Sequence, residues 1–300
     1  MNADLSGIVL LDKPLGLTSA AAVAKVKRLF GARKAGHTGS LDPLASGFLG
    51  ICFGEATKFG AHLLDADKSY RVGVRLGERT ASGDLETEVC ERCPVPELST
   101  AAVAASLAGF PTEYDQMPPM HSALKHGGKP LYSYARLGIT LERTPRRISI
   151  YSMQLLDWTS PQLRFDVRCS KGTYVRVLAE DMALRLATIG HLVELRRLSV
   201  VPFETAPMYT IEELESMDDA GRRQTILPVD AALQGHPRLD LNASEAQDLR
   251  LGRTPSLAPQ ASGIRRIYGP NAEFLGLGDI EETGRLKPKR LIAADPANRA

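Results

Sequence analysis

Two stretches in the middle of the chain alternate strictly between apolar and polar side chains, and this restricts the fold more than any other feature. The apolar positions of the first stretch are Tyr70, Val72, Val74 and Leu76. Those of the second are Leu163, Phe165, Val167 and Cys169. A period of two is that of a half-buried β-strand, because successive side chains of a strand point to opposite faces. The segment "RRISIYSMQLLDW" before the second stretch predicts a partner strand, with a turn at Ser160 and Pro161.

Other segments have the helical period instead. Residues 18–30 carry Val23, Val26 and Phe30 at helical spacing, with a Ser or Thr cap at the start and Gly31 at the end. The segment "TAAVAASLAGF" predicts a helix that Gly109 ends, and a third helix is expected from about residue 177 to a close at Gly190. This order of elements predicts an α+β domain with a mixed, mainly antiparallel sheet flanked by helices.

The pattern loosens around "LQGHPRLDLN" and changes beyond it. A short helix ("SEAQDLRLG") is followed by short strand-like runs such as "IRRIYG" and "EFLGLGDIE". We therefore predict two domains, one over residues 1–236 and a small, largely β domain over residues 237–300.

Composition places the chain among ordinary globular proteins, with 43% hydrophobic and 24% charged residues. The early apolar run at residues 8–11 is too short for a signal peptide or a membrane span, so we expect a cytoplasmic protein without a membrane partner. Four cysteines in 300 residues, without dense spacing, are expected to be reduced.

Charge is unevenly distributed although its sum is only +2. Residues 78–97 carry six acidic and two basic side chains, whereas residues 121–147 carry six basic and one acidic. The basic stretch is rich in glycine and contains Tyr132 and Tyr134, which suits a basic arm over about residues 116–147 that meets phosphates and stacks on bases. A solvated loop would have the same charge pattern, and charge alone favours that simpler interpretation.

The segment "GHTGSLDPLASG" places a lone carboxylate, Asp42, directly before Pro43 among several glycines. One interpretation makes Asp42 a helix N-cap with Pro43 at the first helical position. That interpretation leaves the glycines unexplained, since glycine is used where another molecule approaches the backbone or where φ is positive. The loop is therefore also a candidate ligand site.

A second cluster lies in "CSKGTYVRVLAED", where a strand gives way to a helix. Arg176 there could form an ordinary pair with Glu180, four residues further along the helix. Alternatively, it is a bidentate partner that holds a catalytic carboxylate ionised and oriented. Only the second interpretation involves Asp42.

Motifs for cofactors are weak. Cys90 and Cys93 form a single CxxC without a second pair at zinc-binding distance. Neither a phosphate-binding P-loop nor a GxGxxG after a strand is found, and neighbours such as Ser40, His37 and Asp42 rarely make a catalytic triad. We therefore expect side-chain chemistry without a metal or an organic cofactor.

Several collinear segments resemble the bacterial tRNA pseudouridine-55 synthases, the TruB family. They are "LDKPLGLTS", "GHTGSLDPLASG", "KSYRVGVRLGERT", "QMPPMHSALKHGGKPLYSYARLG" and "RCSKGTYVRVLAEDM…LRRL". The C-terminal "FLGLGDIEETGRLKPKRL" resembles the small PUA-like domain of the same enzymes. Gly50 stands where many members have proline, and His121 where an aromatic residue is common.

The resemblance implies a pseudouridine-synthase-like fold with a C-terminal PUA-like RNA-binding domain. It implies an isomerase that flips uridine-55 out of the tRNA T loop, breaks its N1–C1′ bond and reattaches the ring through C5. The expected partner is the T-arm stem-loop of tRNA, and the protein is expected to act as a monomer.

The resemblance also assigns roles to individual residues. Asp42 matches the catalytic aspartate, which attacks the substrate or removes a proton from it. Tyr70 matches the tyrosine that lies against the base and accepts its C5 proton, and Arg176 matches the arginine paired with the carboxylate. Tyr174 and Leu195 match base-pocket positions, and His37 matches the histidine that fills the space left by the extruded nucleotide.

Physical reasoning agrees with these roles, because unstacking a base costs a few kcal/mol and stacking on an aromatic ring returns about 1–3 kcal/mol. The glycines near Asp42 would then let the ribose approach. Two alternatives stay open: a non-catalytic tRNA-binding or remodelling protein, which needs no carboxylate facing RNA, and an enzyme of free nucleosides, which needs no basic arm.

Overall fold

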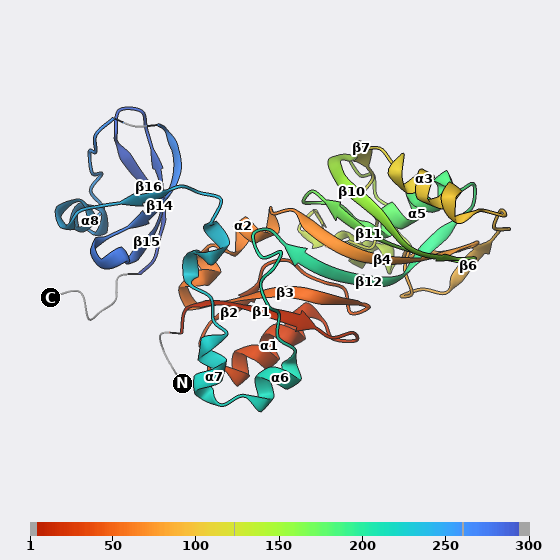
Figure 1. Cartoon of the computed structure of the whole chain (residues 1–300), viewed down its shortest axis with the longest axis horizontal. Coiled ribbons are helices and arrows are strands. Elements are labelled where there is room, and N and C mark those ends of the chain that lie inside the picture. The colour runs from red at the N-terminus through yellow and green to blue at the C-terminus, as the bar shows by residue number, and fades with distance from the viewer. Residues whose placement is uncertain (1–4, 123, 260, 294–300) are drawn as a thin grey trace.

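A computed structural model of the protein describes residues 5–122, 124–259 and 261–293 (Figure 1). An eight-stranded sheet runs through the larger part of the molecule in the order β1-β3-β12-β4-β11-β10-β7, with β2 paired to β3. Its strands are β1 Gly7–Lys13, β2 Ala35–His37, β3 Ala45–Phe53, β4 Lys68–Leu76, β7 Glu113–Gln116, β10 Arg146–Thr159, β11 Gln162–Cys169 and β12 Gly190–Val200. All pairs are antiparallel except β12 with β3, which confirms the predicted mixed, mainly antiparallel sheet.

Helices and 3-10 turns cover both faces of the sheet at β1 and β3. Helix α1 (Ser19–Leu29) begins at Thr18, whose side chain accepts a hydrogen bond from Ala21 N, as predicted for a Thr cap. Together with α6 (Ile211–Ser216), it buries apolar side chains of β1 and β3. The opposite face of these strands is covered by the 3-10 turn η1 (Gly54–Lys58), α2 (Gly60–Leu64) and the 3-10 turn η2 (Val229–Leu233).

The other half of the sheet carries α3 (Thr100–Ala108) and α5 (Val175–Arg185) on one face. The two alternating stretches form β4 and β11, and their predicted apolar side chains all point into this core. The third helix ends at Arg185 rather than at Gly190, so that part of the prediction is wrong. Gly190 instead opens β12, because the chain turns at Ala187, whose φ is +57°.

Strand β12 lies at the centre of the sheet and joins its two halves. It pairs in parallel with β3 and antiparallel with β4. In Figure 1 it crosses the molecule between these two strands. Because β12 lies between β3 and β4, it brings the loop that contains Asp42, just before β3, close to Tyr70 on β4.

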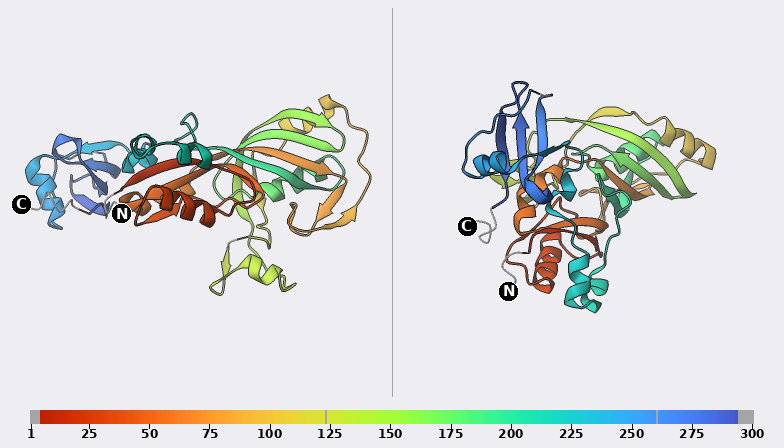
Figure 2. Two further views of the ribbon diagram at one scale, coloured as in Figure 1. Left: turned by 90° about the horizontal axis from the view of Figure 1, so that it is seen from below. Right: turned by 60° about the vertical axis from the view of Figure 1, so that its left-hand side comes forward.

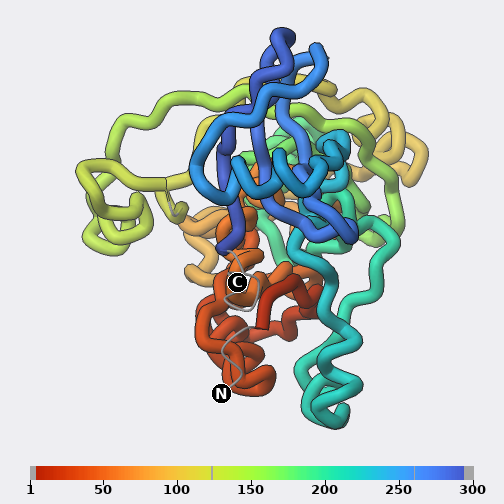
Figure 3. Tube along the Cα trace, turned by 90° about the vertical axis from the view of Figure 1, so that its left-hand side faces the viewer, coloured from red at the N-terminus to blue at the C-terminus, as the bar shows by residue number. Residues whose placement is uncertain are grey.

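The basic arm leaves the sheet at the end of β7 and returns at the start of β10. It contains only short elements, β8 (Lys125–His126), β9 (Lys129–Pro130) and α4 (Leu131–Ala135), which agrees with the expectation of little regular structure. The arm stands out from the sheet in Figure 2, and Figure 3 shows the same projection from another side.

The acidic segment begins with a hairpin of β5 (Glu78–Thr80) and β6 (Val89–Arg92). Cys90 is exposed on β6, and Cys93 contacts the hydroxyl of Thr188; all four cysteines are free thiols, as expected. Within residues 5–122, 124–259 and 261–293, the helices are too short or too polar to span a bilayer.

After β12, α6 and α7 (Asp219–Gln224) lead to a C-terminal unit at one end of the molecule (Figure 1). Its sheet has the order β13 (Arg238–Asp240), β14 (Gly263–Tyr268), β15 (Phe274–Ile280) and β16 (Leu286–Leu291), with α8 (Ala243–Arg250) and the 3-10 turn η3 (Pro270–Ala272). This confirms the short helix and the largely β content predicted beyond residue 237. Phe274 packs edge-on against Phe59 of the larger part, and Lys58 Nζ donates to Leu291 O at 3.1 Å.

Candidate active site

Asp42 lies in the loop between β2 and β3, and its side chain is 53% exposed. The N-cap interpretation is wrong, because the residues after Asp42 form a turn and then β3 rather than a helix. The carbonyl of Asp42 accepts a hydrogen bond from Ala45 N at 3.0 Å, which closes a turn with Pro43 at its second position. The turn presents the carboxylate to solvent.

Helix α1 fixes the backbone just before Asp42. Ser19 is buried, and its hydroxyl accepts from Leu41 N at 2.8 Å and donates to Leu41 O at 3.0 Å. One side chain thus satisfies both backbone groups of Leu41. This restrains the loop one residue before the carboxylate.

Arg176, the second residue of α5, reaches Asp42 from the other half of the sheet. Its Nη2 lies 3.5 Å from Asp42 Oδ2, and its Nη1 lies 3.3 Å from Asp84 Oδ2. In the part of the chain that was placed, these are its ion pairs, so the alternative pairing with Glu180 is not formed. The guanidinium is shared between two carboxylates, which corrects the prediction of a bidentate contact with Asp42 alone.

Asp84 was not identified from the sequence. It is one of several acidic residues in 78–97, and no spacing distinguishes it. Its carboxylate is 7% exposed and accepts hydrogen bonds from the Ser82 hydroxyl at 2.6 Å and from Glu86 N at 2.9 Å. The buried Asp84 carboxylate therefore has partners on both of its oxygens, whereas one side of the Asp42 carboxylate is exposed to solvent.

Three more side chains near Asp42, two charged and one aromatic, lie in one line of directly opposite residues that crosses four neighbouring strands. In this line Lys13 lies opposite Gly47, Gly47 opposite Arg197, and Arg197 opposite Tyr70. The four residues come from β1, β3, β12 and β4. Sheet order, not sequence spacing, therefore brings them together.

Tyr70 is buried on the apolar side of β4, as predicted. Burial raises the pKa of Tyr70, although the positive charge of Arg197 opposes this shift. The phenol is therefore protonated at neutral pH and presents a neutral aromatic ring.

Arg197 was also missed by sequence reasoning. It is 3% exposed, and its donors serve carbonyl oxygens: Phe48 O at 2.8 Å, Gly39 O at 3.0 Å and Ser40 O at 3.4 Å. Two of these carbonyls belong to the loop that carries Asp42. Arg197 thus ties this loop to the central strand.

Glycine is required at position 47 by a close contact within the protein itself. Its φ is +96°, and a Cβ atom there would lie 2.2 Å from Arg197 O. The expectation that the loop glycines make room for ribose is therefore wrong at Gly47, where β3 and β12 approach each other closely. Gly36 has no heavy atom within 4 Å of such a Cβ position.

Lys13 is completely buried beside this loop, and its Nζ donates to Pro14 O at 2.8 Å and Leu17 O at 2.7 Å. Desolvation lowers the pKa of Lys13, while the negative charge of Asp42 raises it. Lys13 belongs to the quoted segment "LDKPLGLTS", but no role was predicted for it.

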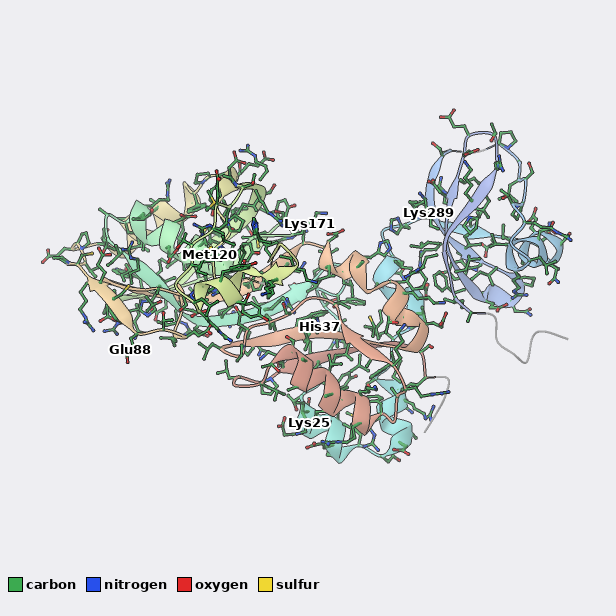
Figure 4. The ribbon with its side chains drawn as sticks, turned by 180° about the vertical axis from the view of Figure 1, so that it is seen from behind. Lys25, His37, Glu88, Met120, Lys171 and Lys289 are labelled. Atoms are coloured by element: carbon green, nitrogen blue, oxygen red, sulfur yellow. The ribbon has the colours of Figure 1, made fainter. Side chains whose placement is uncertain are left out.

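His37 is exposed at the end of β2, and Figure 4 labels it near the middle of the molecule. Its Nδ1 accepts a hydrogen bond from Gly39 N at 3.4 Å. Partial desolvation and the charge of Arg197 lower the pKa of His37, so the ring is neutral at pH 7. It therefore offers an uncharged ring at the surface beside the Asp42 loop.

A shallow cleft opens at Asp42. Its lining residues are Asp42, Leu44, Ala45, Asp84, Leu85, Leu192, Val193, Glu194 and Leu195. Of the residues predicted for the site, Asp42 and Leu195 line this cleft, whereas His37, Tyr70, Tyr174 and Arg176 do not. Tyr174 is the N-cap residue of α5, two residues before Arg176. The exposed side chains of Leu44 and Leu85 give the cleft apolar walls suited to a flat, uncharged group.

Comparison with family models gives three matches along the chain. Residues 27–175 match the N-terminal domain of the TruB family pseudouridylate synthases. Residues 176–234 match the tRNA pseudouridylate synthase B C-terminal domain, and residues 237–292 match the C-terminal model of pseudouridine synthase II TruB.

Two similar curated proteins share one name. The tRNA pseudouridine synthase B of Chromohalobacter salexigens is 48% identical over 293 residues, covering 96% of this chain and 94% of that protein. The protein of the same name from Sodalis glossinidius is 47% identical, with coverages of 97% and 96%.

Solved structures support the fold. An H/ACA RNP bound to a substrate RNA containing 2'-deoxyuridine matches with a TM-score of 0.72 at 21% identity, covering 96% of this chain and 85% of that one. A Cbf5-Nop10-Gar1 complex matches with a TM-score of 0.70 at 24% identity, covering 96% and 84%.

Proposed function

This chain belongs to the TruB family of pseudouridylate synthases, and we propose that its substrate is uridine-55 in the T loop of tRNA. It isomerises uridine to pseudouridine in tRNA, as its relatives at 42–48% identity are named to do. The N1–C1′ bond breaks and a C5–C1′ bond forms. The proton on C5 leaves and N1 gains one, so product and substrate have the same composition.

The observation that carries this proposal is the exposed Asp42 carboxylate beside a buried guanidinium. Asp42 supplies the carboxylate that acts on the nucleotide as the glycosidic bond is exchanged. Arg176 orients this carboxylate from one side, while the side that faces the cleft is open to the substrate. An oriented charge contributes to catalysis because less solvent has to reorganise around it once the substrate covers the cleft.

The target base would enter the cleft after leaving its stack. Leu195 forms part of the wall. The neutral ring of Tyr70 is buried outside this lining, and we assign it contact with a base that has entered beyond the wall. We assign Tyr174, the N-cap residue of α5 two residues before Arg176, to the same base pocket. The uncharged ring of His37, at the surface beside the Asp42 loop, occupies the gap in the RNA that the flipped nucleotide leaves.

RNA binding is assigned to two further parts of the chain. The arm, residues 116–147, carries exposed cations that suit the phosphates of the T-arm stem-loop. We assign catalysis to residues 1–236 and additional RNA binding to the PUA-like residues 237–300. We further propose that the protein acts as a monomer in the cytoplasm, where tRNA is available.

The test is single-turnover conversion of a T-arm stem-loop labelled with tritium at C5 of the target uridine. Tritium release, together with mass spectrometry after cyanoethylation, measures pseudouridine formation. We expect release from the stem-loop with uridine at the target position and none when cytidine replaces it. A protein that binds this RNA tightly but releases no tritium would contradict the proposal and support a non-catalytic tRNA-binding role.

A further inference from the structure

Gln116 occupies the point where β7 ends and the arm begins. It is 2% exposed, and its amide group contacts another segment of the chain. Its Oε1 accepts from Tyr174 N at 2.7 Å, and its Nε2 donates to Tyr174 O at 3.2 Å. The Nε2 also donates to the Tyr114 hydroxyl at 3.0 Å, which in turn donates to Asp181 at 2.9 Å.

The residue that Gln116 holds is the one from which α5 starts. Tyr174 is the N-cap residue, and no side chain caps this helix end in the usual way. Gln116 pairs with both backbone groups of Tyr174, which requires a side chain with an acceptor and a donor at fixed spacing. The amide of glutamine meets this requirement.

A second contact joins the arm to the same helix. Arg176 Nη2 donates to the carbonyl of His121 at 2.6 Å, five residues beyond Gln116. The intervening residue Met120 is labelled in Figure 4, in the half of the molecule that carries α5. The root of the arm, residues 116–121, therefore contacts the start of α5 at Tyr174 and at Arg176.

These contacts affect the geometry of the reacting groups. The distances from Arg176 to Asp42 and Asp84, 3.5 Å and 3.3 Å, depend on where the first turn of α5 lies. A displacement of about 1 Å in a catalytic constellation costs up to about 10²-fold in rate. A group that fixes this turn therefore influences catalysis without touching the substrate.

We propose that Gln116 is a positioning residue that couples the arm to the catalytic pair Arg176 and Asp42. When the arm seats on RNA, Gln116 transmits its position to Tyr174 and thereby aligns the guanidinium with the carboxylate. This inference rests on the proposed function, since it concerns the rate of the same reaction.

The first test compares Gln116→Met with the wild-type protein in the tritium-release assay. Methionine has a similar length but cannot pair with the backbone of Tyr174. We expect the single-turnover rate to fall by about tenfold or more, with the Kd for the stem-loop RNA changed less than about twofold. An unchanged rate would overturn the inference, as would equal losses of rate and affinity accompanied by a lower Tm.

The second test uses Gln116→Glu, because a protonated carboxyl group has nearly the shape and the donor of an amide. We expect this variant to be slow at pH 8 and to approach the wild-type rate as the pH falls and the introduced carboxylate becomes protonated. A merely structural role does not produce such a relative pH profile. A rate ratio between Gln116→Glu and wild type that is flat with pH would count against the inference.

The matched control is Tyr114→Phe. This change removes the link to Asp181 but leaves both contacts between Gln116 and Tyr174, so its rate should stay within about twofold of wild type. If Tyr114→Phe is as slow as Gln116→Met, the effect comes from packing beneath the arm and the inference is wrong. If the wild-type protein releases no tritium, the proposed function fails first, and this inference with it.

Discussion

Arg176 Nη2 lies 3.5 Å from Asp42 Oδ2, although Arg176 belongs to helix α5 and Asp42 to the loop between β2 and β3. The same guanidinium contacts Asp84, which is buried and also accepts bonds from Ser82 and Glu86. One cation thus serves two carboxylates of different exposure. The buried carboxylate anchors the guanidinium, and the exposed one remains available to the substrate.

Asp42→Asn should abolish turnover while leaving RNA binding intact. The amide keeps the size of the side chain but loses the charge and nucleophilicity, so we expect a rate at least ~10³-fold lower. Tritium release and filter binding with the same stem-loop measure the two properties. Full activity in this variant would contradict the assignment of Asp42, as would complete dependence of the wild-type reaction on zinc.

Asp84→Asn should slow the reaction by about tenfold with little effect on RNA affinity. The amide can still accept from Ser82, but Arg176 loses its anchoring charge and is free to shift. Asp166→Asn is the control, because Asp166 also pairs with an arginine, Arg71, and neither of these residues lines the cleft. Equal rates for the two variants would show that Asp84 has no special role.

Arg197→Lys should lower both stability and activity. The guanidinium reaches its three carbonyl groups from three different nitrogens, and the single nitrogen of a lysine cannot occupy all three positions, so we expect the free energy of unfolding to fall by about 2–4 kcal/mol. Arg196→Lys, at the partly exposed pair with Asp12, should cost about 1 kcal/mol or less. Urea denaturation of both variants checks this difference, and similar losses in the two would contradict it.

The pKa of Asp181 predicts a pH dependence of stability. Burial raises the pKa of Asp181 above its ordinary value of 3.8, and the hydrogen bond from Tyr114 only partly opposes this. The folded protein therefore binds the Asp181 proton more strongly than the unfolded chain does. The resulting contribution to the free energy of unfolding is fully present below pH 3.8 and is lost as the pH rises through the pKa of Asp181 in the folded protein. Asp181→Asn lacks this titration and keeps an acceptor for Tyr114.

Denaturation by urea at several pH values between about 4 and 7 tests this sign. We expect the stability of Asp181→Asn relative to wild type to increase as the pH rises across that range. A relative stability that is constant, or that decreases with pH, would show that burial does not raise the pKa of Asp181.

The exposed cations of β16 should contribute to tRNA affinity. Lys287, Lys289 and Arg290 lie on the surface of the C-terminal unit, where Figure 4 labels Lys289. Changing all three to glutamine should weaken binding by about tenfold and reduce its salt dependence, because fewer counterions are released. The single-turnover rate at saturating protein should not change.

Lys25→Gln is the control for this prediction, since Lys25 pairs with Glu215 on α6, far from β16 in Figure 4. Binding isotherms at several salt concentrations should show a shallower slope for the triple variant alone. An unchanged affinity would argue against RNA contact by the C-terminal unit.

Local pattern was sufficient to predict much of the fold. The strands that became β4 and β11, and the helices that became α1 and α3, have one buried face, so burial imposes a visible period on the sequence. Strand β12 was missed because it is buried at both ends and its register shifts twice, between Leu192 and Glu194 and between Arg197 and Ser199. Those shifts break the period of two.

By itself, the sequence predicted the elements with one buried face and the arm. Its resemblance to the family predicted Asp42, Arg176 and Leu195 as site residues. Only the tertiary structure showed that Asp84 contacts Arg176, that Arg197 binds the loop carrying Asp42 and that Gln116 holds the start of α5. These three contact the site through backbone carbonyls, a shared guanidinium and a helix start that lie far away in the chain. Such contacts leave no local period, because they depend on which strands become neighbours when the sheet assembles.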